Sequence, residues 1–485
     1  MNMGSSLFKD NRALLIFFGT ALCFIFPIIN ADVYYRDDLF RAASGFYGWS
    51  MLGRPLTDVI MRVLTNSGDL LIDSSPYTYI LSAASIAFAS LSLKDYLDKH
   101  NVKNSTFTAC LLIFNPLFVQ NYLYVFDSLS MSLAFMAAVI SYCFECNNKY
   151  LSLSIKVFMG VASLSLYQPC FNIFIALCMV DSAIYLIDKS RPTNDFIKQI
   201  FFKALSFLGS YSLYYLLIAN VLIPNNSRSQ TIFSVGNPIE SLKSNIFSIY
   251  SMVSSFFLGT ALPYFILGLV LVATSIALLL LSKRTTITHA ILGLSVAIVA
   301  FLASILGPTY ILANAPIMPR AVVTLSLLLV FISLICSGWM KQAKFLIALT
   351  AIPFIVISSH VSNIVSEQRK FEESMFTMIA NDIVNSREDI GSVKIIGTAV
   401  VSPRAKQLIK EHGELRYFLS PVVGTQASFL LESKGIPHIE HPYSSQDEVK
   451  SLVESLKSDS SSFIIRNDLY SIYRAGRSVI VQLGK

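Results

Sequence analysis

Long apolar runs alternate with short polar segments from residue 13 to residue 363 of the chain. Most of these runs approach the length of about 20 residues that an α-helix needs to cross a bilayer. We therefore predict a mainly α-helical membrane protein with about eleven membrane-spanning helices. The predicted spans are residues 13–31, 77–93, 106–122, 126–144, 153–167, 169–187, 200–223, 260–281, 287–306, 319–338 and 343–363.

Two segments between these runs have the pattern of helices that do not cross the membrane. Segment 55–66 begins with proline and carries one apolar stripe, with Asp58 and Arg62 one turn apart on its other face. Such a helix suits the membrane interface. A second helix is predicted to begin with Asn237 as its cap and Glu240 in its first turn. The stripe of the first segment is Leu56, Val59, Ile60, Val63 and Leu64.

The tail from residue 366 has a different pattern, in which β-rich runs alternate with helical ones. This alternation predicts a small α/β domain. We therefore divide the chain into a membrane domain, 1–365, which includes the outer loop 32–76, and a C-terminal domain, 366–485. The predicted strands are 392–401, 461–466 and 478–483, and the predicted helices lie near 403–412, 424–433 and 445–457.

Composition and charge support a membrane protein and set its orientation. Of the 485 residues, 54% are hydrophobic and 14% charged, against about 25% charged in soluble domains. The net charge of +7 does not indicate nucleic-acid binding, because most basic residues lie in short loops. Lys9 and Arg12 precede the first run, and alternate loops are basic, so we expect a cytoplasmic N-terminus. An odd number of spans then puts the tail on the outer side.

Ionisable residues gather at the outer ends of the predicted spans. Seven of the candidates lie in the loop after the first run, while Asp127 opens the fourth span and Arg320 the tenth. Predicted topology brings these residues to one membrane face. The seven loop candidates are Asp32, Arg36, Asp37, Asp38, Arg41, Arg54 and Asp58.

This set of side chains suits a reaction between a lipid-borne donor and a water-borne acceptor. An arginine binds phosphate with two parallel hydrogen bonds, and Arg320 is our leading candidate, followed by Arg36, Arg41 and Arg54. A carboxylate can take the proton of an attacking hydroxyl, which we assign to Asp37 or Asp38. Paired acids also suit a divalent cation such as Mg²⁺ or Mn²⁺, although they do not by themselves establish one.

Simpler roles exist for each of these residues. Adjacent acids are usually solvated loop charges, and Asp127 suits the cap of its helix. Arg320 suits an interfacial anchor, and Asp58 with Arg62 a surface ion pair. Tyr167-Gln168-Pro169 suits a tight turn between two spans.

Two other classes of function compete with the enzyme. The first is a transporter or flippase of a lipid-linked sugar, favoured by Asp181, an acid well inside a predicted span. The second is a structural or assembly protein whose tail binds a partner. This last class leaves the acids and arginines of the outer face without a role.

Three stretches resemble the serotype-converting type II group of bacterial and phage O-antigen glucosyltransferases. RDDLFRAASGFYGWSMLGRPLTDVIMR (36–62) is similar to the first outer loop of that group. FNPLFVQNYLYVFDSLSMSLA (114–134), which contains Asp127, and SLSLYQPC (163–170), which contains Tyr167 and Gln168, match its later outer turns. The likeness covers most of residues 1–340.

The resemblance implies a GT-C-like membrane fold in the bacterial inner membrane. It implies an undecaprenyl-phosphate-glucose donor and an O-antigen polysaccharide acceptor of lipopolysaccharide in the periplasm. It favours Asp37 and Asp38 as the acidic motif, supported by Arg36, Gly53-Arg54-Pro55 and Asp127.

The tail has two interpretations. One is that it positions the acceptor polymer above the membrane, and the other is that it forms a lid or stabilising cap. Its candidate sugar-stacking residues are Tyr417, Tyr443, Tyr470 and Tyr473. All seven cysteines lie outside the tail, so we expect it to fold without disulfides.

Overall fold

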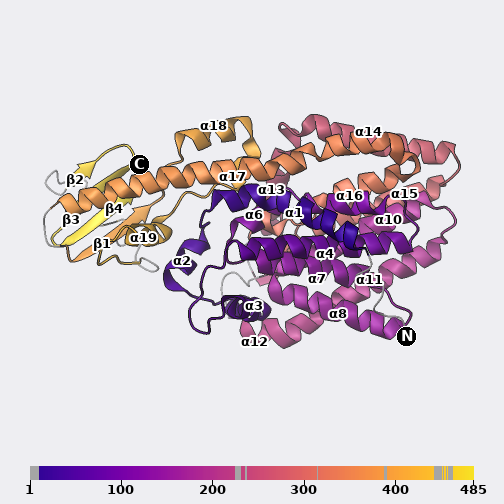
Figure 1. Ribbon diagram of the computed structural model, residues 1–485, viewed down its shortest axis with the longest axis horizontal. Coiled ribbons are helices and arrows are strands. Elements are labelled where there is room, and N and C mark those ends of the chain that lie inside the picture. The colour runs from indigo at the N-terminus through magenta and orange to yellow at the C-terminus, as the bar shows by residue number, and fades with distance from the viewer. Residues whose placement is uncertain are drawn as a thin grey trace. The chain divides into compact units, whose positions relative to one another are not determined.

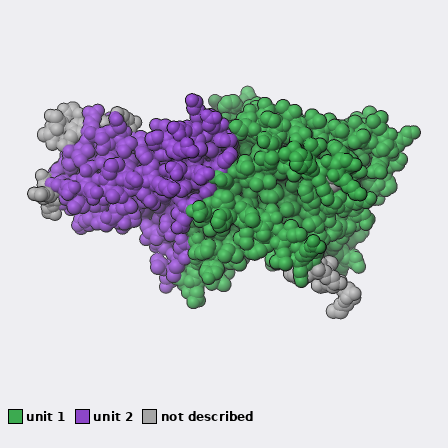
Figure 2. Space-filling model, turned by 45° about the horizontal axis from the view of Figure 1, so that its top comes forward, with its two compact units in different colours: residues 1–30, 47–67, 74–359 green, residues 31–46, 68–73, 360–485 purple. Residues whose placement is uncertain are grey.

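The computed structural model is mainly helical, with a small sheet near the C-terminus (Figure 1). It describes residues 10–223, 231–234, 237–313, 315–386, 390–441, 451, 453–454, 456 and 463–484. Residue contacts group the chain into two compact units, coloured separately in Figure 2. Unit 1 comprises 1–30, 47–67 and 74–359, and unit 2 comprises 31–46, 68–73 and 360–485. Unit 2 thus includes two pieces of the outer loop, and the division at residue 365 stays a prediction.

Within the described residues, eight helical segments are long and apolar enough to cross a membrane. The chain is therefore a multi-pass membrane protein, and the count of eleven spans stays a prediction. The eight are α1 (Asn11–Ala31), α4 (Tyr77–Lys99), α8 (Lys149–Leu166), Gln168–Ile187, Thr193–Leu222, α14 (Leu262–Leu281), α15 (Ile287–Ser304) and Lys341–Asn385.

Several of these segments consist of consecutive helices, and shorter helices complete unit 1. Segment 168–187 comprises η3 (Gln168–Phe171), α9 (Asn172–Ala176) and α10 (Cys178–Ile187). Segment 193–222 comprises α11 (Thr193–Tyr214), η4 (Tyr215–Ala219) and α12 (Asn220–Leu222). The last is part of α17 (Met340–Asn385). The others are η1 (Ser50–Leu52), α3 (Pro55–Thr65), α5 (Ser105–Cys110), η2 (Leu111–Ile113), α6 (Val119–Leu123), α7 (Ser128–Cys143), η5 (Ile232–Ser234), α13 (Pro238–Leu258), η6 (Gly307–Ile311), η7 (Pro319–Ala321), α16 (Ser326–Ile335) and η8 (Cys336–Trp339).

The predicted span 106–122 is not one continuous helix. It is divided into α5, η2 and α6, and the break falls at Asn115-Pro116. Proline has no N–H to continue a helix. The Asn115 side chain instead donates to the carbonyl of Val323 at 2.6 Å and accepts from the N–H of Phe118 at 3.4 Å. The second bond satisfies a backbone N–H that an unbroken helix would have paired, and the first satisfies a carbonyl of the segment before α16.

The helix predicted at 55–66 is confirmed as α3, and Leu56, Val59 and Val63 of its apolar stripe are exposed, while its place in the membrane interface stays a prediction. Val63 is 75% exposed, whereas Asp58 and Met61 are buried against the rest of unit 1. A surface helix of a soluble protein buries its apolar face and exposes its charged face, whereas α3 does the opposite. This arrangement suits contact with lipid. The second predicted helix is confirmed as α13, where Asn237 Oδ1 accepts from the N–H of Glu240 at 3.3 Å.

Unit 2 contains a four-stranded mixed sheet in the order β1-β4-β3-β2. β1 pairs with β4 in parallel, and the other two pairings are antiparallel. The predicted strands are confirmed as β1 (Ser392–Gly397), β2 (Phe463–Arg466) and β4 (Ser478–Leu483), and sequence reasoning missed β3 (Tyr470–Ala475). The predicted helices 403–412 and 424–433 are confirmed as α18 (Pro403–Glu411) and α19 (Gly424–Glu432), with η9 (Gly413–Tyr417) between them. Most of the predicted helix 445–457 lies outside the described residues.

The core of unit 2 joins three parts of the sequence. Phe376 and Ile379 of α17 pack with β-strand residues such as Ile395. Leu39, from α2 (Asp37–Ser44), belongs to the same core. A short piece of the outer loop is therefore part of the C-terminal fold.

We expect Gly397→Ala to destabilise unit 2 more than Gly435→Ala. Both glycines have left-handed φ, +86° and +84°, so each substitution should carry the cost of about 1–2 kcal/mol for that conformation. A Cβ at Gly397 would also collide with the carbonyl of Leu483, whereas one at Gly435 would meet nothing within 4 Å. Proteolysis of the detergent-solubilised chain against temperature measures the difference. Equal midpoints for the two variants would contradict the packing at the end of β1.

Candidate functional site

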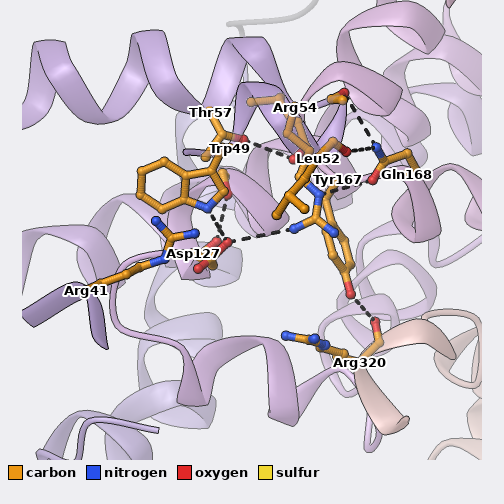
Figure 3. Close-up of polar contacts among 12 residues, drawn as sticks. Arg41, Trp49, Leu52, Arg54, Thr57, Asp127, Tyr167, Gln168 and Arg320 are labelled. Atoms are coloured by element: carbon orange, nitrogen blue, oxygen red, sulfur yellow. Dashed lines mark hydrogen bonds and ion pairs between the residues drawn. The ribbon is translucent and has the colours of Figure 1, made fainter. Parts of the chain in front are cut away.

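The carboxylate of Asp127 is the centre of a polar group in unit 1 (Figure 3). Asp127 lies immediately before α7 and is 6% exposed, yet its side chain does not cap that helix. The indole N–H of Trp49 donates to its Oδ1 at 2.7 Å, and Nη1 of Arg54 lies 3.9 Å from the same atom. Together with their neighbours these residues form what we call the Asp127 cluster: Trp49, Arg54, Asp127, Tyr167, Gln168 and Arg320.

Arg54 is fixed by contacts on two sides. Its guanidinium lies over the Tyr167 ring, 4.6 Å from the centroid, and its Nε donates to Gln168 Oε1 at 3.1 Å. Gln168 Nε2 donates in turn to the carbonyl of Leu52 and to the Tyr214 hydroxyl, both at 2.9 Å. Gly53 has a φ of +72°, and a Cβ there would collide with the Tyr214 hydroxyl. Glycine is therefore required where the loop meets α11.

Arg320 reaches the cluster from η7, which precedes α16. Its guanidinium lies 4.5 Å from the centroid of the Tyr124 ring. Its backbone N–H donates to Gln120 Oε1 at 2.9 Å, and its carbonyl accepts from the Tyr167 hydroxyl at 3.4 Å. Tyr167 therefore contacts both arginines, one through its ring and the other through its hydroxyl.

The cluster holds two guanidinium groups and one carboxylate. Burial lowers the pKa of Arg54, the negative charge of Asp127 opposes this, and the positive charge of Arg320 lowers the pKa further. Arginine nevertheless stays protonated in proteins. The six side chains of the cluster thus carry an excess of positive charge, and such a group favours an anion that both arginines can contact.

Asp58 fixes the turn that carries Trp49. Its Oδ1 accepts from the Trp49 N–H at 3.2 Å, and its Oδ2 accepts from the N–H and the hydroxyl of Ser50. Arg62, the expected ion-pair partner of Asp58, lies instead over the Tyr47 ring at 4.2 Å. A substrate contact of Asp58 stays a prediction.

The acidic pair Asp37-Asp38 lies in unit 2, at the start of α2, and its two members have different surroundings. Asp37 is exposed, whereas Asp38 is fully buried and its Oδ2 accepts from the N–H of Tyr35 at 3.1 Å. Arg36 precedes them with a φ of +49°, a conformation that costs a residue other than glycine about 1–3 kcal/mol. Arg41 is buried, and its Nη1 donates to the carbonyl of Phe46 at 2.9 Å.

Residues of the C-terminal part hold this loop inside unit 2. The hydroxyl of Tyr35 donates to the carbonyl of Phe418 at 2.7 Å, and Nη2 of Arg369 donates to the carbonyl of Tyr34 at 2.5 Å. The Phe40 and Phe429 rings pack with centroids 5.6 Å apart. The position of the acidic pair within unit 2 therefore depends on residues near the end of the chain.

Sequence reasoning found five residues of the Asp127 cluster and missed several of their partners. Trp49, Gln120, Tyr124 and Tyr214 were missed. Trp49 and Tyr124 lie inside the stretches that carry the family resemblance, which is a usable signal. Tyr214 lies in an apolar span and has no signal of its own.

Three other predicted candidates, Asp181, Tyr470 and Tyr473, make hydrogen bonds within the fold. Asp181 is buried and accepts hydrogen bonds from the hydroxyls of Tyr96 and Tyr142, so its oxygens are occupied within the helix bundle. Tyr470 donates to Asp382 at 2.5 Å, and burial raises its pKa to about 12. Tyr473 is buried and donates to Gln482 at 3.1 Å. Tyr417 is half-buried, and Tyr443 lies outside the described residues.

A divalent cation stays a prediction. Within the described ranges, no group of three or more histidine, cysteine, aspartate or glutamate residues is arranged to hold a metal ion.

Comparison with known proteins agrees with the resemblance of the outer loops. Residues 26–337 match the family described as Glucosyl transferase GtrII. The chain is 26% identical over 428 residues to an "Uncharacterized 55.3 kDa protein in gtrB 5'region" of Salmonella phage P22, covering 86% of this chain and 88% of that protein. No solved structure matches the chain. Because the family match extends over most of the chain and includes every residue of the Asp127 cluster, this protein belongs to the GtrII glucosyl transferase family.

Proposed function

We propose that this protein transfers a glucosyl group from undecaprenyl-phosphate-glucose to the O-antigen of lipopolysaccharide, and so converts the serotype. We place the reaction on the periplasmic side of the bacterial inner membrane, with the N-terminus in the cytoplasm and the C-terminus in the periplasm. Membership of a glucosyl transferase family supports the transfer. A helical membrane unit with an acidic loop after its first helix is compatible with a GT-C-like fold.

The observation that carries the proposal is the pair of arginines beside one carboxylate in a multi-pass membrane protein. Undecaprenyl phosphate leaves the reaction as an anion, and two guanidinium groups stacked on tyrosine rings suit that phosphate. An apolar cavity of about 290 Å³ between α14, α15, α16 and α17 supports a donor with a hydrocarbon chain. Leu328, which lines it, follows Arg320 closely along the chain.

The proposed reaction gives a role to the acidic pair and to two arginines. The acceptor hydroxyl oxygen attacks the anomeric carbon, the bond from that carbon to the phosphate oxygen breaks, and undecaprenyl phosphate departs with the electron pair. A carboxylate of the acidic pair takes the hydroxyl proton. One direct displacement of this kind inverts the anomeric carbon. Arg54 and Arg320 stabilise the negative charge of the leaving phosphate.

Asparagine at the acid that acts as general base, Asp37→Asn or Asp38→Asn, should lower transfer by about 10²–10⁴-fold, the usual contribution of a general base, because an amide keeps the size of the carboxyl and loses its basicity. The measurement is mass spectrometry of O-antigen from cells that express each variant, where the intact chain should add one hexose per modified unit. Exposed Asp69 in the same outer loop supplies the control Asp69→Asn, which should leave transfer unchanged. Full transfer by both single variants and by the double variant would remove the acidic pair from the mechanism.

Arg320→Ala should weaken binding of the polyprenyl-phosphate donor by about tenfold or more, the effect of losing one charge-assisted contact. Arg320→Lys should recover only part of it, because lysine keeps the charge and loses the planar fork. Arg62→Lys is the matched control, since Arg62 also stacks on a tyrosine ring and lies outside the cluster. Donor titration with purified variants measures the affinities. An unchanged apparent affinity in Arg320→Ala would overturn the phosphate assignment.

Tyr35→Phe should reduce the turnover rate and leave donor affinity unchanged. The variant removes only the hydroxyl that anchors the acidic loop to the carbonyl of Phe418, so the loop loses a fixed position while the arginines stay intact. Exposed Tyr77 gives the control Tyr77→Phe. Initial rates at saturating donor compare the two. A turnover rate equal to that of the unmodified chain would show that this anchor has no part in positioning the acids.

A further inference from the structure

A pocket of about 870 Å³, lined by both charged and apolar side chains, lies in unit 1 at the helix ends farthest from the Asp127 cluster. α8 packs against both α7 and α11. One end of α7 lies at Asp127 and one end of α8 at Tyr167, and α11 ends at Tyr214, which accepts a hydrogen bond from Gln168 of the cluster. These helices can be followed in Figure 1. The pocket is lined where α7 gives way to α8 and along the first half of α11. The 16 residues of α7 separate the two sites by about 24 Å at 1.5 Å per residue.

Four lysines line this pocket, and two of them are not explained by membrane topology. Lys99 and Lys149 lie at helix ends, where the positive-inside rule accounts for basic residues. Lys156 lies about two turns inside α8, and Lys203 nearly three turns inside α11. Charged residues that deep in apolar helices are costly and usually mark a functional site.

Lys203 is held in place by aromatic side chains. It is 3% exposed, its amine donates to the carbonyl of Tyr142 at 2.5 Å, and it lies 3.7 Å from the centroid of the Tyr142 ring. Lys156 lines the same pocket as Lys203. An anion placed between two ammonium groups of one pocket offsets their mutual repulsion.

The acidic residues that line the pocket are fewer than its lysines. Glu145 and Asp195 are the two acidic lining residues, against four lysines. Asp181 lies behind the aromatic rings, where it accepts hydrogen bonds from Tyr96 and Tyr142. The four lysines thus leave the pocket wall with an excess of positive charge.

The same pocket has an apolar edge on the outside of the helix bundle. Tyr150 and Phe202 line it and are 85% and 59% exposed, and Leu153 lies with them. In a multi-pass membrane protein such exposed apolar side chains contact lipid tails. An anion with hydrocarbon chains fits both the lysines and this edge, whereas a soluble anion fits only the lysines.

We propose that this lysine pocket binds one anionic glycerophospholipid, with the phosphate between Lys156 and Lys203 and the acyl chains along Tyr150 and Phe202. The bound lipid neutralises the paired lysines and joins α7, α8 and α11 at the end opposite the Asp127 cluster. This site is separate from the proposed glucosyl transfer and does not depend on it.

Native mass spectrometry of the full chain in detergent tests the proposal with added phosphatidylglycerol and, separately, neutral phosphatidylcholine. We expect one phosphatidylglycerol to bind at least tenfold more tightly than phosphatidylcholine. Lys156→Gln should weaken that binding by about tenfold, the effect of one charge-assisted contact. Exposed Lys149→Gln, which cannot disturb the core, should weaken it in the same direction. Lys198→Gln is the matched control on α11, exposed and outside the pocket, and should change binding less than twofold.

Four results would overturn the proposal. They are equal retention of the two phospholipids, unchanged binding in both Lys156→Gln and Lys149→Gln, and binding of polyprenyl phosphate without phosphatidylglycerol. The fourth is displacement of phosphatidylglycerol by an equal concentration of inorganic phosphate, which would identify a soluble-anion site.

Discussion

The arrangement of unit 1 around the Asp127 cluster depends on one interaction, the contact of Asp127 with Trp49 and Arg54. A carboxylate this deeply buried is stable only when its charge is matched and its oxygens accept hydrogen bonds. Because Trp49 and Arg54 contact this carboxylate, loop residues 47–67 lie against the start of α7. Arg54 in turn donates a hydrogen bond to the side-chain amide of Gln168. Tyr167 links Arg54 to Arg320, because its ring lies against the guanidinium of Arg54 and its hydroxyl donates to the carbonyl of Arg320. Four segments that are distant in sequence are thereby fixed around one positively charged group.

Much of the fold follows from physical patterns that are local in sequence. Apolar length identified helices such as α14 and α15, and the alternation of strands and helices identified the C-terminal sheet. The hydropathy pattern gave wrong helix boundaries where a proline or a tertiary contact decided the structure instead. Asn115-Pro116 lies inside an apolar run that hydropathy reads as one helix, and α17 continues to Asn385, well past the predicted end at 363. Its last turns pack on a sheet, so tertiary contacts rather than membrane length decide where it ends.

For the candidate site, the residue types could be predicted but their partners could not. Aspartate and arginine at the ends of the predicted spans are visible in the sequence, because charge is rare inside the apolar runs. The indole that binds Asp127 is 78 residues away from it, and the hydroxyl that binds Gln168 is 46 residues away. Such pairings depend on how helices pack, and no periodicity encodes them. Asp58 shows the same limit, because helical spacing suggested Arg62 as its partner and the fold instead directs its carboxylate to Trp49 and Ser50.

The anchoring of the acidic loop also has a consequence for biosynthesis. Tyr35 and the carbonyl of Phe418 that holds it are separated by 383 positions. At a synthesis rate of about 5–20 residues per second, the ribosome needs roughly 20–80 seconds to make the second partner after the first. Throughout that interval the nascent chain has inserted its first helix while its acidic pair still lacks its final support. The order of translation therefore delays completion of this loop until the last part of the protein has been made.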